Sequence, residues 1–175
     1  PNEEGSLWTM LAAFNSTLYN ALFLSLTIER EWNAGEVGGM PWFEKLDNEE
    51  RLAEIAKEQF RVKIRSRLVD PTSPFYVGPA ILPPEERSEF FYDHPHTDEV
   101  STWIDLEENH FSGSQSITTL ATKADNRKAE RKIELEKLAD EIDQRLYDIL
   151  NISDSVQDDI NDEIALRTVQ DPRKR

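Results

Sequence analysis

Residues 117–150 constrain the fold of this chain more than any other stretch of its sequence. They are rich in Ala, Glu, Lys, Arg and Leu, and their apolar residues recur at helical spacing: Leu135, Leu138, Ile142, Leu146 and Ile149. This spacing predicts one long amphipathic helix that packs against another helix. Asn151 ends the helix, and Ser153 or Asp154 can cap a final helix over about residues 154–168.

The first part of the chain predicts two further helices. Apolar residues recur every three or four positions after Ser6, which predicts a helix over about residues 7–30. Glycines and tryptophans follow it and predict a turn. A second helix, over about residues 48–69, opens at Asp47, whose carboxylate can accept hydrogen bonds from the first turn. It ends near Asp70, because the residue before a proline disfavours helical angles.

The middle of the chain is irregular. Six of the nine prolines lie between residues 71 and 95, which predicts an irregular or short-strand segment over residues 70–97. A short helix over about residues 99–110 follows, and then the flexible break FSGSQS. We therefore expect a mainly helical α+β fold with two regions, residues 1–111 and 117–175. Because the sequence begins at Pro1 without an initiator methionine, we expect a fragment of a longer polypeptide.

Composition limits the partners and the compartment. The net charge of −15 predicts repulsion of nucleic acids and anionic membranes unless basic groups are segregated locally. The absence of cysteine excludes disulfides, thiolate zinc sites and cysteine nucleophiles, and it favours a reducing compartment, the cytoplasm. The longest apolar stretch falls far short of the roughly 20 residues that span a bilayer, so we expect no membrane partner.

Basic residues cluster on two of the predicted helices. On composition alone they indicate surface helices with intrahelical ion pairs. The alternative is a DNA-binding surface, in which the side chains lie along phosphates and release counterions. The candidate DNA-binding residues are Lys57, Arg61, Lys63, Arg65, Arg67, Lys123, Arg127, Lys128, Arg131 and Lys132.

We predict no catalytic, cofactor-binding or metal-binding residue in this chain. The sequence holds no dinucleotide, P-loop, nucleophile-elbow or zinc-protease motif. Only the cluster from Asp93 to Asp98 has metal-like spacing, with His94 and His96 two residues apart. A solvated polar loop is the favoured interpretation of that cluster, and a metal-dependent hydrolase built on it ranks third among the functional hypotheses.

Two segments resemble the recognition region of large adenine-N6 DNA methyltransferases, the type IIG restriction-methylation enzymes and the BREX phage-defence methylases. The first is LAAFNSTLYNALF at residues 11–23, followed by IEREWNAGEVGGMPW; it carries Asn15-Ser16, Leu18-Tyr19, Val37-Gly38 and Met40-Pro41. The second is ELEKLADEIDQRLYDILNIS at residues 134–153, with Ile142-Asp143, Leu146-Tyr147 and Leu150 to Ser153 in step. Gly39 replaces the usual acidic or polar residue, and Asn151 stands where glycine is usual.

This resemblance implies a non-catalytic part of an enzyme that reads double-stranded DNA. The family's [DN]-P-P-[YF] motif and glycine-rich S-adenosylmethionine loop are absent here, so S-adenosylmethionine would bind elsewhere in the parent enzyme. The implied partners are duplex DNA and defence-system protein subunits. The alternative hypothesis is a non-enzymatic helical module that binds a protein partner.

Overall fold

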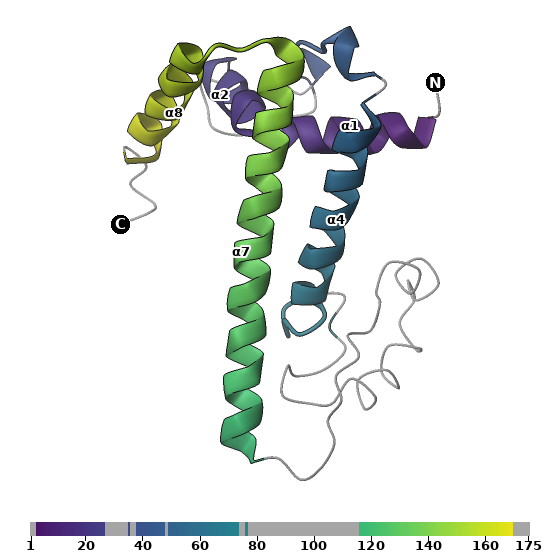
Figure 1. The fold of residues 1–175 in the computed structure, drawn as a ribbon, viewed down its shortest axis with the longest axis vertical. Coiled ribbons are helices and arrows are strands. Elements are labelled where there is room, and N and C mark those ends of the chain that lie inside the picture. Colours follow the sequence, from purple (N-terminus) through teal and green to yellow (C-terminus); the bar gives the residue numbers. More distant parts are fainter. Residues whose placement is uncertain are drawn as a thin grey trace. The chain divides into compact units, whose positions relative to one another are not determined.

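A computed structural model describes residues 3–26, 35, 38–47, 49–73, 76 and 116–169 (Figure 1). The described elements are α1 (Glu3–Phe14), α2 (Thr17–Leu26), the 3₁₀ helix η1 (Glu44–Leu46), α4 (Glu50–Arg67), α7 (Ile117–Leu150) and α8 (Asp154–Val169). These residues include no strand, and the prediction of a mainly helical fold is confirmed. None of the described helices is both long and apolar enough to cross a membrane.

The chain divides into two compact units. The first unit comprises Pro1–Lys57 and Leu138–Arg175, and the second comprises Glu58–Lys137. The boundary that the sequence suggests, between residues 111 and 117, lies largely outside the described residues, as do the predicted helix 99–110 and most of segment 70–97.

The predicted helix 7–30 is interrupted at Asn15 and Ser16, which separate α1 from α2. The Ser16 hydroxyl donates to the Ala13 carbonyl (2.6 Å) and accepts from the Tyr19 amide (3.2 Å). Ser16 therefore caps α2, because its oxygen satisfies an amide that has no partner in the first helical turn. Hydrophobic spacing continues across such a break, so periodicity alone predicts one helix where two form.

Helix α4 also begins differently from the prediction. It starts at Glu50, two residues later than a cap at Asp47 requires. The Asp47 carboxylate instead accepts from the Trp42 indole nitrogen (2.7 Å), and Asp47 terminates η1. At the other end, the Thr72 amide (3.0 Å) and hydroxyl (2.7 Å) both donate to Asp70, which forms a turn around Pro71 close to the predicted end of the helix.

The two C-terminal helices have nearly the predicted bounds. Asn151 has a positive φ of 55°, so it occupies the left-handed position that usually favours glycine. The Ile152 amide donates to the Tyr147 carbonyl (2.9 Å), and the Asn151 amide donates to Asp148 (3.3 Å). These two bonds form a Schellman motif, which ends α7 and turns the chain toward α8.

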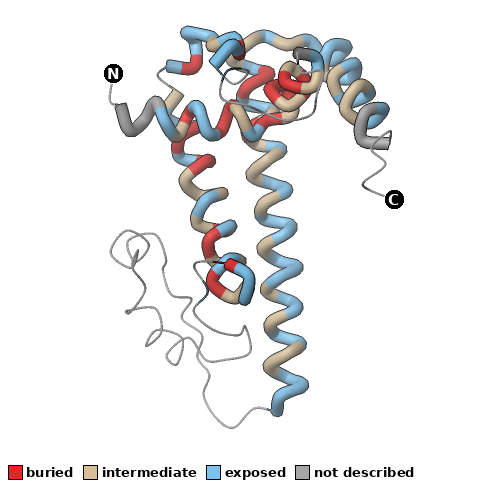
Figure 2. The backbone as a smooth tube through the Cα atoms, turned by 180° about the vertical axis from the view of Figure 1, so that it is seen from behind, coloured by how far each residue is buried: buried red, intermediate tan, exposed pale blue. Residues whose placement is uncertain are grey.

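The main hydrophobic core belongs to the first unit. Figure 2 shows that α7 is buried only near its C-terminal end, where Ile142, Leu146 and Tyr147 lie. Residues from α1, α2, the turn before η1, η1 itself and the start of α4 complete this core: Ala12, Ala13, Tyr19, Phe23, Met40, Leu46, Leu52, Ile55 and Ala56. Trp42 packs against the core, with its ring 6.4 Å from that of Phe14. The tryptophan after the glycines thus anchors a turn.

Candidate functional site

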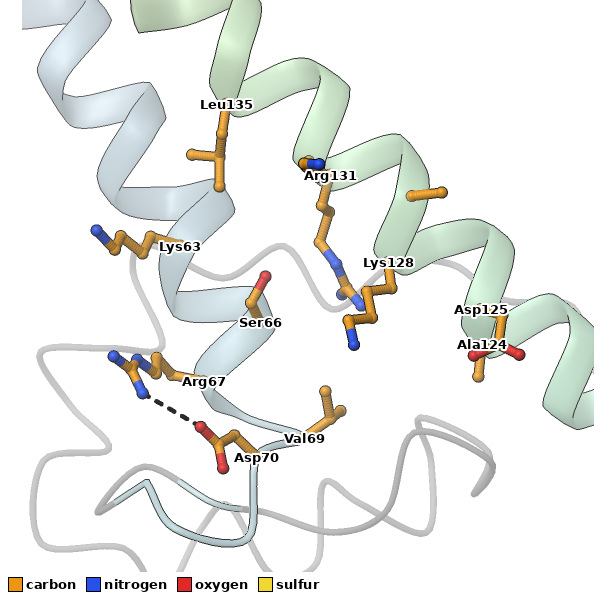
Figure 3. A pocket seen from close by; sticks show the side chains of 12 residues that line it. Lys63, Ser66, Arg67, Val69, Asp70, Ala124, Asp125, Lys128, Arg131 and Leu135 are labelled. Carbon is orange, nitrogen blue, oxygen red and sulfur yellow. Dashed lines mark hydrogen bonds and ion pairs between the residues drawn. The ribbon is translucent and has the colours of Figure 1, made fainter. Parts of the chain in front are cut away.

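A cavity of about 850 Å³ lies within the second unit, between the end of α4 and the first half of α7. Five of the ten predicted DNA-binding residues line it: Lys63, Arg67, Lys128, Arg131 and Lys132. Figure 3 shows Lys128 and Arg131 extending from α7 toward the last residues of α4. The fold therefore brings together cations that are separated by about 60 residues in the sequence.

Helical spacing explains why these side chains share one site. On α4, Lys63, Ser66 and Arg67 are three or four residues apart and occupy one face of the helix. On α7, Asp125, Lys128 and Lys132 repeat the same spacing. Each helix thus contributes a continuous polar row to the cavity.

The part of the cavity lining that the structure describes carries a net positive charge. It comprises five cations and two carboxylates, those of Asp70 and Asp125, although the whole chain has a net charge of −15. The hydrogen bonds from the hydroxyl and the amide of Thr72, assisted by Arg67, hold the pKa of Asp70 below its usual value. Arg67 lies 3.1 Å from Asp70 in an ion pair that Figure 3 marks with a dashed line.

Apolar side chains form the rest of the lining. They are Val69, Ala124, Ala129 and Leu135. Sequence reasoning selected the cations by charge and missed these residues and Ser66. The available signal was the spacing of Ala124, Ala129 and Leu135 beside the basic residues of α7, which places them on neighbouring parts of the helix surface.

The other predicted cations do not line this cavity. Lys57 belongs to the first unit, where its ammonium lies 6.0 Å from the centre of the Trp8 ring. Arg61 pairs with Glu58 at 2.9 Å, one turn away on α4. Arg65, Lys123 and Arg127 are absent from the lining.

Intrahelical pairing also occurs inside the site. Lys132 lies 3.7 Å from Glu136, and both side chains are well exposed. Exposed pairs of this kind contribute about 0–1 kcal/mol, so they leave the cation available to a stronger partner. Lys63 and Lys128 have no ion pair within the part of the chain that the structure describes.

Most of the residues that carry the methyltransferase resemblance lie in the first unit, and several of those that the structure describes make structural contacts. The amide of Thr17 donates to Asp143 (2.7 Å), and the Thr17 hydroxyl donates to the same carboxylate. Burial raises the pKa of Asp143, and this outweighs the opposing effect of the two Thr17 hydrogen bonds. Burial also raises the pKa of Tyr19 to about 12, and its hydroxyl donates to the Pro41 carbonyl (2.9 Å). These groups join α2 to the end of α7 and to the turn before η1.

Residues 3–26, 38–47, 49–73 and 116–169 hold no group of three or more His, Asp or Glu side chains that could bind a metal ion. The His94 and His96 cluster lies outside the described residues. No family model, curated protein or solved structure matches this chain.

Proposed function

We propose that this chain is the non-catalytic DNA-recognition part of an adenine-specific N6 DNA methyltransferase, acting in a cytoplasmic restriction-modification or phage-defence system. The observation that carries the proposal is that Lys63, Arg67, Lys128, Arg131 and Lys132 all line one cavity. Cations grouped in this way can contact neighbouring phosphates of a duplex and release counterions. The resemblance of residues 11–42 and 134–153 to such enzymes supplies the reaction class and S-adenosylmethionine as the parent's cofactor.

Segregation of charge supports the same proposal. Residues 58–67 carry four basic side chains against one acidic, and residues 117–137 carry six against four. By contrast, α8 carries five acidic side chains against one basic. These two helical stretches therefore differ in sign from the chain as a whole, which is the local arrangement that an acidic protein needs in order to bind a polyanion.

The test is duplex binding as a function of salt concentration. Fluorescence anisotropy with the full chain and a labelled duplex of about 20 base pairs measures affinity between 0.1 and 0.3 M KCl. If the five cations each contact a phosphate, log K falls against log salt with a slope of about −4.5. Lys128→Glu weakens binding, whereas Lys137→Glu, an equal charge change outside the cavity lining, has a much smaller effect. Equal losses in the two variants contradict the proposal.

A helical module that binds a protein partner is the second candidate. It is favoured by three exposed apolar side chains on α1, Leu7 (60%), Met10 (38%) and Leu11 (41%), which are spaced three or four residues apart. Such a strip can pack against a partner helix, such as one from another defence-system subunit. Burial of this strip would give binding that high salt does not weaken, in contrast to duplex binding.

A further inference from the structure

The cavity of the second unit also has the size and chemistry of a small-molecule site. Its volume of about 850 Å³ lies within the range of roughly 300–1,000 Å³ that is usual for ligand pockets. Ligand pockets combine apolar walls with a few convergent polar groups. This cavity has that composition, whereas a phosphate-contacting surface needs cations alone.

The cations of the cavity suit a compact anion that carries several charges. Arginine forms paired hydrogen bonds with phosphate oxygens, and lysine acts as a point charge. Lys128 and Arg131 extend from α7 toward the end of α4, and Lys132 adds a third charge from α7, whereas the Lys63 side chain points away from α7 (Figure 3). A chain of two or three phosphates offers these groups more charge and more acceptor oxygens than a single phosphate does.

The apolar part of the lining suits a flat ring system. Val69 at the end of α4 and Ala124, Ala129 and Leu135 on α7 offer small aliphatic surfaces. Burial of a nucleobase against such surfaces is favourable, and an arginine guanidinium can stack on its face. The Ser66 hydroxyl donates to the Val62 carbonyl (3.4 Å) and can accept a hydrogen bond from a sugar hydroxyl.

We infer that this cavity binds a nucleoside polyphosphate, with the phosphates held by Lys128, Arg131 and Lys132 of α7 and the nucleoside against Ala129 and Leu135. This inference goes beyond the proposed function, because it requires neither a duplex nor a parent methyltransferase. The two share cations, so a bound nucleotide competes with DNA for the same groups.

Isothermal titration calorimetry with the full chain tests the inference, using ADP, UDP, pyrophosphate and uridine as probes. ADP and UDP are expected to bind with one site per chain. Pyrophosphate, which lacks the nucleoside, is expected to bind at least about tenfold more weakly, and uridine is expected to give no measurable heat. Pyrophosphate binding as tight as that of ADP overturns the inference, because the apolar lining would then contribute nothing.

Two variants test the cationic half and the apolar half of the cavity separately. Lys128→Glu is expected to weaken ADP binding by about tenfold or more, since it replaces an attraction with a repulsion. Ala129→Trp keeps the charge and fills the apolar half, so it is expected to weaken ADP much more than pyrophosphate. Both positions are exposed on α7, which favours folding of the variants. Helicity measured by circular dichroism confirms the fold of each variant.

Lys137→Glu is the matched control, because Lys137 is exposed on the same helix and does not line the cavity. An equal loss of ADP affinity in Lys137→Glu and Lys128→Glu overturns the inference, as does the absence of heat with millimolar ADP and UDP. Duplex binding is measured in a separate experiment, and its outcome bears on the proposed function and on the shared site. Nucleotide binding without duplex binding refutes the proposed function alone, and duplex binding that nucleotides do not inhibit refutes the shared site.

Discussion

The hydrogen bonds between Thr17 and Asp143 hold the start of α2 to the end of α7, across 126 residues of sequence. Asp143→Ala removes the acceptor of both hydrogen bonds. The amide and the hydroxyl of Thr17 then lose this acceptor in a partly buried position. Hydrogen bonds to a charged acceptor contribute about 1.5–3 kcal/mol, so we expect Asp143→Ala to lower the free energy of unfolding by about 2–3 kcal/mol. Thr17→Ala removes only the hydroxyl bond and is expected to cost about 1.5 kcal/mol, the lower end of this range.

Urea unfolding followed by far-ultraviolet circular dichroism measures both losses. The double variant, Thr17→Ala with Asp143→Ala, completes a mutant cycle that isolates the interaction of the two side chains. We expect the loss in the free energy of unfolding of the double variant to be smaller, by about 0.5–1 kcal/mol, than the sum of the losses of the two single variants. Glu134→Ala, an exposed acidic residue earlier on α7, is the control and should change stability by less than about 0.5 kcal/mol. Additive losses, or a cost for Asp143→Ala as small as that of the control, refute the reasoning.

The same carboxylate and the end of α7 give two further predictions. Because burial raises the pKa of Asp143 in the folded state, the folded chain binds this proton more tightly than the unfolded chain does. The stability of wild type relative to Asp143→Asn should therefore increase as the pH falls from 7 toward 4, and urea titrations that show a decrease contradict this. At Asn151, whose φ is 55°, Asn151→Ala should cost about 1 kcal/mol and Asn151→Gly should be neutral or stabilising. Thermal melts that rank alanine above glycine at this position would exclude a left-handed end of α7.

Sequence periodicity predicted the helices whose ends are set by local chemistry. Helix α7 has the predicted bounds, because the polar and basic residues of residues 117–137 favour helix without a tertiary partner and Asn151 tolerates a positive φ. The break between α1 and α2 was not predictable in this way, since it depends partly on Asp143, which is 126 residues from Thr17. Likewise, the Asp47 carboxylate accepts a hydrogen bond from the Trp42 indole instead of capping α4. This choice of partner depends on the folded path of the turn.

The candidate site shows the same division between local and tertiary information. Charge identified Lys63, Arg67, Lys128, Arg131 and Lys132, but it also selected Lys57 and Arg61, whose described contacts are with Trp8 and Glu58. Only the approach of α4 and α7 within the second unit distinguishes the two groups. The apolar residues of the lining are brought to the cavity by the same approach of the two helices. A search for charged residues therefore could not identify them in the sequence.

The reversal of charge along α7 determines how the binding experiments should be read. Residues 117–137 carry six basic side chains against four acidic, whereas residues 138–150 carry one basic side chain against four acidic. A helix rises about 1.5 Å per residue, so Lys128 and Asp143 lie roughly 22 Å apart along α7. This exceeds two Debye lengths at 0.15 M salt but is shorter than the Debye length of about 30 Å at 0.01 M. The carboxylates near Asp143 therefore oppose anion binding at low salt and are screened at physiological salt. A salt slope measured above 0.1 M consequently reports the cations of the cavity, whereas one that includes 0.01 M underestimates their number.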